Sequence, residues 1–120
     1  MRDYKKLSIW QRSLDFSIKI YEKTRQFPAD ERFGLTSQLR RAATSSPINI
    51  AEGCGRDTNR DFAHFIHIAE GSACEVECEL IIAHRVNYLS QSDYAHLAQE
   101  IDEIKRMIAS FKIKVEGDFK

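Results

Sequence analysis

The sequence predicts an all-α fold, an up-down antiparallel four-helix bundle built by a single domain of residues 1–120. Three observations indicate this fold. Apolar residues recur at helical spacing in four long segments, the connections between them are short, and no segment alternates apolar and polar residues as a strand does. The 120 residues are 42% hydrophobic and 30% charged, which excludes a disordered or collagen-like chain and allows a full core.

The first helix is predicted at about residues 8–26, with apolar side chains on two nearly opposite faces. We expect the face that carries Trp10 and Leu14 to enter the core. The second face consists of Ile9, Phe16, Ile20 and Phe27. The helix should end before Pro28, because proline disfavours helical geometry in the preceding residue.

The second helix is predicted at about residues 30–52. Its inner row is made of small side chains, so a neighbouring helix can approach closely; the row is Leu35, Leu39, Ala42, Ser46, Asn49 and Gly53. Pro47 lies inside this helix, where it cannot donate a backbone hydrogen bond and its ring crowds the preceding turn. We therefore expect a kink at Pro47.

The end of the second helix combines polar residues and glycines. Asn49 and Glu52 adjoin the buried row, and we expect them to make structural hydrogen bonds there. Gly53 and Gly55 should end the helix, because glycine adopts the left-handed C-cap conformation without a Cβ clash.

The third helix is predicted at about residues 59–89, with Thr58 as its N-cap. Its main apolar face includes Phe62 and Phe65, which we expect in the core. A further apolar set lies on its other side and consists of Ile68, Cys78, Ile82, Val86 and Leu89. This helix, like the first, is apolar on two faces.

The fourth helix is predicted at about residues 93–114, capped by Ser92 or Asp93. It has one clean apolar face, made of Tyr94, Leu97, Ile101, Ile104, Met107, Ile108, Phe111 and Val115. Its other side is polar. The first and third helices thus carry apolar surface that one bundle core does not need, which favours a closed homo-oligomer assembled through these two helices.

The charges cancel overall but not locally. Lys and Arg number 18 and so do Asp and Glu, whereas residues 1–60 hold 12 basic and 7 acidic side chains and residues 61–120 hold 6 and 11. Around the second helix and its exit the candidates for nucleic-acid contact are Arg40, Arg41, Arg56 and Arg60. Guanidinium groups suit phosphate oxygens and would give salt-sensitive binding with little sequence preference. The alternative is that these arginines pair with the acidic third helix.

Enzymatic, metal and membrane functions find little support. No nucleophile elbow or Cys/His signature is present, and Gly53-Cys54-Gly55 lacks the Lys-Ser/Thr of a phosphate loop, so we expect no catalysis and no cofactor. A metal site through Cys74 and Cys78 would need ligands from another chain, and none is assigned. No apolar run approaches the roughly 18 residues of a membrane span. Three sparse cysteines favour reduced thiols and a cytoplasmic protein.

Several motifs resemble those of one family. They are Leu7–Gln11, Phe27-Pro28, Gly34–Ala43, Asn49–Gly53 with Gly55-Arg56, and Phe62-x-x-Phe65 followed by Ala69-x-Gly71-Ser72. Over about residues 5–90 the chain resembles the bacterial four-helix bundle proteins encoded within intervening sequences of 23S rRNA genes, the S23 ribosomal protein family.

The resemblance implies a cytoplasmic bundle that assembles as a ring-shaped homopentamer, without enzymatic activity. It also implies kinship with the accessory variability protein of diversity-generating retroelements, which binds a reverse transcriptase and nucleic acid. The resulting hypothesis is a non-enzymatic oligomer that binds RNA or DNA weakly through phosphates. The alternative is a scaffold that docks a protein partner, for example a polymerase, on the oligomer.

Overall fold

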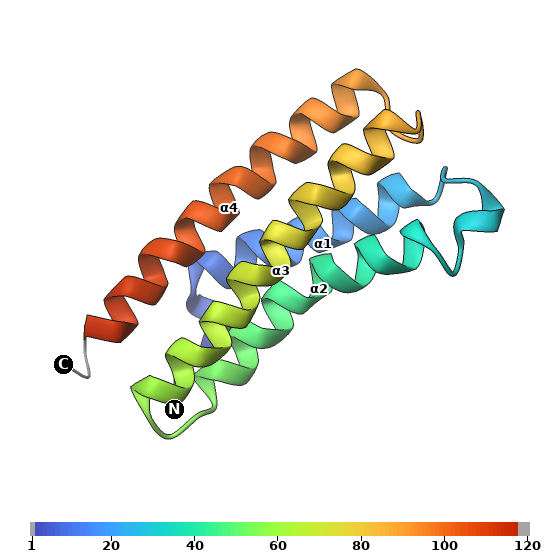
Figure 1. Ribbon diagram of the computed structural model, residues 1–120. Coiled ribbons are helices and arrows are strands. Elements are labelled where there is room, and N and C mark those ends of the chain that lie inside the picture. Colours follow the sequence, from blue (N-terminus) through green and yellow to red (C-terminus); the bar gives the residue numbers. More distant parts are fainter. Residues whose placement is uncertain (1, 118–120) are drawn as a thin grey trace.

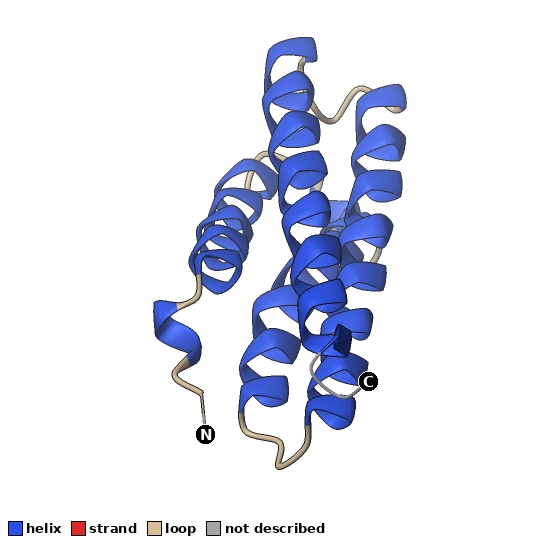
Figure 2. Cartoon of the chain, turned by 90° about the vertical axis from the view of Figure 1, so that its left-hand side faces the viewer, coloured by secondary structure: helices blue, strands red, loops and turns tan. Residues whose placement is uncertain are grey.

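Four helices form the chain in a computed structural model that describes residues 2–117; Met1 and residues 118–120 of the predicted domain lie outside the described residues. The helices are α1 (Ser8–Thr24), α2 (Leu35–Cys54), α3 (Asn59–Arg85) and α4 (Gln91–Gly117), and two short 3₁₀ helices, η1 (Tyr4–Lys6) and η2 (Ala29–Glu31), precede α1 and α2. Successive helices run in opposite directions (Figure 1). The all-helical prediction is confirmed, since residues 2–117 contain no strand (Figure 2).

The observed helix boundaries depart from the predicted ones where α1 joins α2 and where α3 joins α4. Residues 29–31 form η2, so α2 begins at Leu35 and not at residue 30. The carboxylate of Glu31 accepts the Leu35 N–H at 3.1 Å and so fixes this start. Helix α3 ends at Arg85 and not at residue 89, because Asn87 adopts a left-handed φ of 66°, which interrupts a helix.

The capping residues agree with the sequence in one case and differ in the other. Thr58 caps α3 as predicted, accepting the Asp61 N–H at 3.1 Å. The cap of α4 was assigned to Ser92 or Asp93, but the helix begins earlier: Ser90 Oγ accepts the Asp93 N–H at 3.1 Å. Helix α4 also continues beyond residue 114 to Gly117, and α1 ends at Thr24 and not at residue 26.

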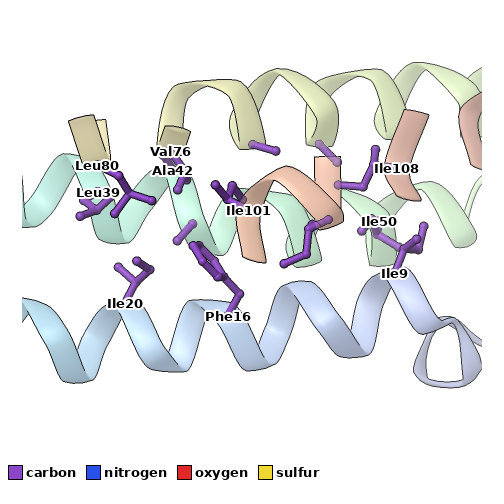
Figure 3. Packing of buried hydrophobic residues seen from close by; sticks show 14 of the residues in the cluster. Ile9, Phe16, Ile20, Leu39, Ala42, Ile50, Val76, Leu80, Ile101 and Ile108 are labelled. Carbon is purple, nitrogen blue, oxygen red and sulfur yellow. The ribbon is translucent and has the colours of Figure 1, made fainter. Parts of the chain in front are cut away.

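The prediction of which face of α1 enters the core is wrong. Ile9, Phe16 and Ile20 are buried, whereas Trp10 and Leu14 are only partly buried. Figure 3 shows the first three side chains pointing from α1 toward the residues of α2 and α4. The physical reason is the hydroxyl residues that share the buried face, Ser13, Ser17 and Thr24. Their small side chains let α2 approach α1 closely, although they weaken the apolar pattern of that face.

Pro47 is buried inside α2, and a neighbouring helix compensates for its missing N–H. Because Pro47 has no N–H, it donates no hydrogen bond to the carbonyl of Ala43, four residues earlier. The Ser17 hydroxyl of α1 lies 2.8 Å from that carbonyl oxygen and also 2.8 Å from the carbonyl oxygen of Ser13, so its single hydrogen is shared between the two acceptors. A donor of α1 therefore lies within hydrogen-bond distance of the carbonyl that the proline leaves without a partner in α2.

Helices α2 and α3 pack through small polar side chains. Ser46 Oγ donates to the carbonyl of Ala69 at 2.9 Å, and the hydroxyls of Ser45 and Ser72 lie 2.7 Å apart. Asn49 donates to the carbonyl of Ser45 at 2.8 Å, which is the structural role expected of it. The contacts of Ser46 with Ala69 and of Ser45 with Ser72 hold the two helices together where the side chains are too small to bury much apolar surface.

Gly55 ends helix α2 as predicted, but neither Gly53 nor Gly55 adopts the left-handed conformation expected of a C-cap. Gly53 lies within the helix, and Gly55 follows its last residue with an ordinary right-handed φ of −86°. Gly53 is required for space instead: a Cβ at this position would lie 2.8 Å from Cδ1 of the buried Phe62 and 3.0 Å from Cβ of Phe65. Helices α2 and α3 thus cross closely at Gly53. Phe62 is in the core as predicted, whereas Phe65 is partly exposed.

Beside the shared core, ion pairs join α1 to α4 across an exposed edge. They are Arg12–Glu103 at 2.9 Å, Lys19–Glu100 at 2.5 Å and Lys23–Asp93 at 3.1 Å. Near the start of α1 the two helices separate and leave a hollow of about 550 Å³ that Leu7, Met107 and Phe111 help to line. Basic groups of the first half of the chain therefore do pair with acidic groups of the second half, but through α4.

No helix of the described chain has the length and apolarity to cross a membrane.

Candidate nucleic-acid interface

The four arginines chosen from the sequence form two groups at opposite ends of α2. Arg40 and Arg41 lie in its first half, and Arg56 and Arg60 lie just beyond its end and at the start of α3. Sixteen residues separate Arg40 from Arg56, about 24 Å at a rise of roughly 1.5 Å per residue. A single protomer therefore does not bring all four together.

Arg40 of α2 makes its hydrogen bonds to α1 and so holds the two helices together. Its Nε donates to Thr24 Oγ1 at 2.8 Å, its Nη2 donates to the carbonyl of Tyr21 at 3.3 Å, and its guanidinium lies 4.6 Å from the centre of the Tyr21 ring. Both acceptors belong to the last turn of α1. Arg40 is thus chiefly a structural residue.

Arg41 has a different environment from its neighbour. It is exposed, and its guanidinium has no hydrogen-bond, ion-pair or ring partner among residues 2–117. It lines two hollows, one between α2 and α3 beside Glu75 and one at the junction of α1 and α2. Of the two adjacent arginines, Arg41 is the one with a guanidinium available to a phosphate.

Arg56 and Arg60 lie at the turn between α2 and α3. Arg56 donates to the carboxylate of Glu52 at 2.8 Å, and its guanidinium lies 4.5 Å from the centre of the Phe65 ring. Glu52, expected to make a structural bond, therefore holds an exposed arginine. Arg60 is exposed in the first turn of α3.

The pairing of arginines with the acidic third helix is not observed for Arg40 or Arg56. The acidic residues of α3 that form ion pairs with another helix receive lysines of α4 instead. Lys105 binds Glu77 at 3.0 Å and Lys112 binds Glu70 at 2.5 Å. Neither of these ion pairs involves an arginine of α2.

A basic and aromatic hollow that the sequence analysis missed lies where α1 passes into α2. Its volume is about 380 Å³, and we name it the α1–α2 hollow; it is lined by Tyr21, Arg32, Phe33, Thr36, Ser37, Arg40, Arg41 and Thr44. Phe33 is 88% exposed, and the Arg32 guanidinium lies 5.3 Å from its ring centre. The sequence signal for this hollow is the pair Arg32-Phe33 between Pro28 and Gly34. A second helix predicted from residue 30 includes this pair and so hides its place in a connection.

Two apolar strips remain at least partly exposed, one on α1 and one on α3. The α1 strip consists of Trp10, Leu14, Ile18 and Tyr21, with Ile48 of α2 beside it, and the α3 strip consists of Ile68, Ile82 and Val86. A hollow of about 280 Å³ lies in the α1 strip between Trp10, Leu14 and Pro47. The prediction that α1 and α3 carry surplus apolar surface therefore agrees with the structure.

An unusual carboxyl group adjoins the α3 strip. Glu79 is only 6% exposed, and its Oε1 has no hydrogen-bond partner among the described residues. Burial, together with the nearby Glu75 carboxylate, raises the pKa of Glu79 from its ordinary value of 4.5 to about 7. Glu79 thus holds a proton close to neutral pH.

The cysteines and acidic residues do not gather around a common point. All three cysteines are free; Cys74 and Cys78 are exposed, and burial raises the pKa of the Cys54 thiol. Within residues 2–117 no three His, Cys, Asp or Glu side chains lie close enough to hold one metal ion.

The fold and the site together define a four-helix protein with a basic, aromatic hollow at one end. The chain belongs to the 23S rRNA-intervening sequence protein family, whose model matches residues 5–110. Its structure is similar to that of a protein of unknown function from the S23 ribosomal protein family of Bacteroides thetaiotaomicron VPI-5482. The two share 25% sequence identity with a TM-score of 0.80, over 87% of this chain and 97% of that one. No curated protein matches the chain. The family expected from the sequence motifs is confirmed.

Proposed function

We propose that the chain is a non-enzymatic, cytoplasmic protein that forms a homo-oligomeric ring and binds RNA or DNA weakly through phosphates, with little sequence preference. The observation that carries the proposal is the exposed guanidinium of Arg41, without a partner among residues 2–117, in a hollow shared with Arg32 and Arg40. Grouped guanidinium donors suit phosphate oxygens. The family description, which names 23S rRNA intervening sequences, is consistent with a nucleic-acid ligand.

The structure changes the weight of the individual contacts. Arg41 and Arg32 are the principal candidates for phosphate contact at one end of α2. Arg40 lines the same hollow and holds α1 against α2 there. Arg56 and Arg60 form a second basic group at the other end. In an oligomer, groups of this kind recur in every subunit, so several weak phosphate contacts act together on one strand.

The two apolar strips support assembly. They lie on different helices, so contact between the α1 strip of one copy and the α3 strip of the next is heterologous, and heterologous contacts close into rings when the rotation per subunit permits. Five subunits is the number implied by the resemblance to the family. Light scattering should give a multiple of the 13.9 kDa protomer mass. Ile18→Glu or Ile82→Glu should shift it to the monomer, with Ile113→Glu on α4, which is 68% exposed, as the matched control.

Fluorescence anisotropy with labelled RNA and DNA tests the binding proposal. Affinity should fall steeply from about 50 to 200 mM salt, because counterions released from phosphates dominate such binding. Arg41→Ala should reduce the slope of log K against log salt by about one unit. Lys114→Ala, which removes one exposed charge at the other end of the molecule, is the control. Absence of binding by the wild-type protein even at low salt would contradict the proposal.

A second candidate function is a scaffold for a protein partner, favoured by the apolar hollow between Trp10, Leu14 and Pro47. This candidate would replace the first if the wild-type oligomer forms but binds no nucleic acid.

A further inference from the structure

We propose that the α1–α2 hollow selects single-stranded nucleic acid, stacking one unpaired base on Phe33 while Arg32 and Arg41 contact neighbouring phosphates. This inference rests on the proposed function and specifies its ligand. The first observation is the exposure of Phe33: a phenylalanine with 88% of its surface in water gains nothing for the protomer's own core. Phe33 belongs to the connection between α1 and α2, and this connection lies at one end of the bundle (Figure 1).

The loop that carries Phe33 is held in place, so the ring is presented by an ordered segment. The Glu31 carboxylate accepts two hydrogen bonds, from the Leu35 N–H at 3.1 Å and from the Tyr88 hydroxyl at 2.7 Å. Gly34 makes this arrangement possible, because a Cβ there would lie 2.6 Å from Glu31 Oε1. A loop ordered before binding loses less conformational entropy when it binds.

The charges around Phe33 favour a polyanion. The Arg32 guanidinium lies over the ring, and neither Arg32 nor Arg41 forms an ion pair with an acidic group in residues 2–117. Glu31, the nearest carboxylate along the chain, is occupied by Leu35 and Tyr88. A phosphate approaching the hollow thus meets two guanidinium groups that form no ion pair within residues 2–117.

The size and chemistry of the hollow suit one nucleotide. Its volume of about 380 Å³ lies near the lower end of the range for small-ligand sites, roughly 300–1,000 Å³. Ser37 and Thr36 supply hydroxyls on its wall. An aromatic ring combined with arginines is the arrangement by which proteins hold unpaired bases, since every base has a stacking face. In a duplex those faces are covered by neighbouring base pairs, so the same ring has nothing to stack on.

The test compares labelled oligonucleotides of equal phosphate number binding to the full-length protein. The probes are a mixed-sequence single strand, a hairpin duplex and a strand of abasic sites. Phe33→Ala should weaken binding of the single strand by about tenfold, from the loss of one stacked base. It should leave the salt slope unchanged, since no phosphate contact is lost. Phe33→Tyr, which keeps the ring, should retain wild-type affinity, and Ile113→Ala serves as the control for loss of an exposed apolar side chain.

The outcomes separate this inference from the proposed function. Wild-type binding that is equal for all three probes and unaffected by Phe33→Ala would overturn single-strand selection while leaving phosphate binding intact. No wild-type binding to any probe would overturn both. A changed molar mass for Phe33→Ala in light scattering would assign Phe33 to a subunit contact and also overturn the inference.

Discussion

The hydroxyl of Ser17 takes the place of the backbone N–H that Pro47 lacks. It lies 2.8 Å from the carbonyl oxygen of Ala43, the acceptor that an ordinary residue at position 47 would serve from within α2. The bond is buried and crosses from α1 to α2. A proline that would otherwise leave an unpaired acceptor in the interface is thereby compatible with a continuous helix.

Ser17→Ala should therefore lower the free energy of unfolding by about 1–3 kcal/mol, the cost of leaving a buried acceptor unpaired. In a Pro47→Ala background the restored N–H donates to the Ala43 carbonyl, so Ser17→Ala should lower the free energy of unfolding much less. A double-mutant cycle measured by urea unfolding checks this. Ser13→Ala is the control, because its hydroxyl only donates to Trp10 within α1. Equal costs in both backgrounds would contradict the relationship.

Gly53→Ala should destabilise the fold, because its Cβ would lie 2.8 Å from the buried ring of Phe62. Overpacking of this kind costs about 1–3 kcal/mol. Gly71→Ala is a matched change in α3, where a Cβ would meet nothing within 4 Å. There the higher helix propensity of alanine should stabilise by up to about 1 kcal/mol. Thermal unfolding of the two variants should thus shift in opposite directions, and a neutral Gly53→Ala would show that α2 and α3 can separate at this point.

The buried Glu79 should make stability depend on pH. Its pKa is raised from 4.5 to about 7 on folding, so between these values the folded chain binds more protons than the unfolded chain. The contribution of Glu79 to stability is therefore fully present below pH 4.5 and falls as pH rises through the window to about 7. Glu79→Gln should flatten this dependence in chemical unfolding measured at a series of pH values, whereas Glu22→Gln at an exposed site should not. An unchanged profile in Glu79→Gln would assign the dependence to other groups.

Arg40→Ala and Arg41→Ala should separate structure from binding. Loss of the Arg40 bonds to Thr24 and to the Tyr21 carbonyl should reduce stability by roughly 1 kcal/mol. Arg41→Ala touches no partner in the described chain, so its stability should stay within about 0.5 kcal/mol of wild type. Its effect should appear in the salt dependence of RNA binding instead. Two variants with the same stability and the same salt slope would show that these adjacent arginines do not differ in role.

The sequence was a good guide where one strong pattern competed with no other. The single apolar stripe of α4 and the Thr58 cap of α3 were predicted correctly, because local spacing and local chemistry decide them. The face of α1 was not, since both of its faces are apolar and only the position of α2 decides which is buried. Arg40 and Arg41 are adjacent and have the same chemistry. Their roles differ because the end of α1 offers hydrogen-bond acceptors to Arg40 and not to Arg41.

Phe33 shows a different limit. The residues around it, with Asp30, Glu31 and Arg32, are compatible with a first helical turn, so the sequence predicts a helix there. The loop depends on a long-range bond from Tyr88, 57 residues away, to Glu31. Such a bond leaves no periodic pattern in the sequence, so the most exposed aromatic residue of the hollow emerged only from the structure.

The ion-paired edge between α1 and α4 implies that the bundle opens unevenly. Exposed pairs such as Arg12–Glu103 contribute only about 0–1 kcal/mol each and weaken as salt increases, whereas α2 and α3 are joined by buried hydroxyl bonds that salt does not screen. Backbone amides facing this edge should therefore exchange with solvent deuterium through brief local openings, well before those of α2 and α3. Because Tyr21 of α1 forms one wall of the α1–α2 hollow, we expect ionic strength to affect both the proposed binding of a polyanion and the rigidity of the surface proposed to bind it.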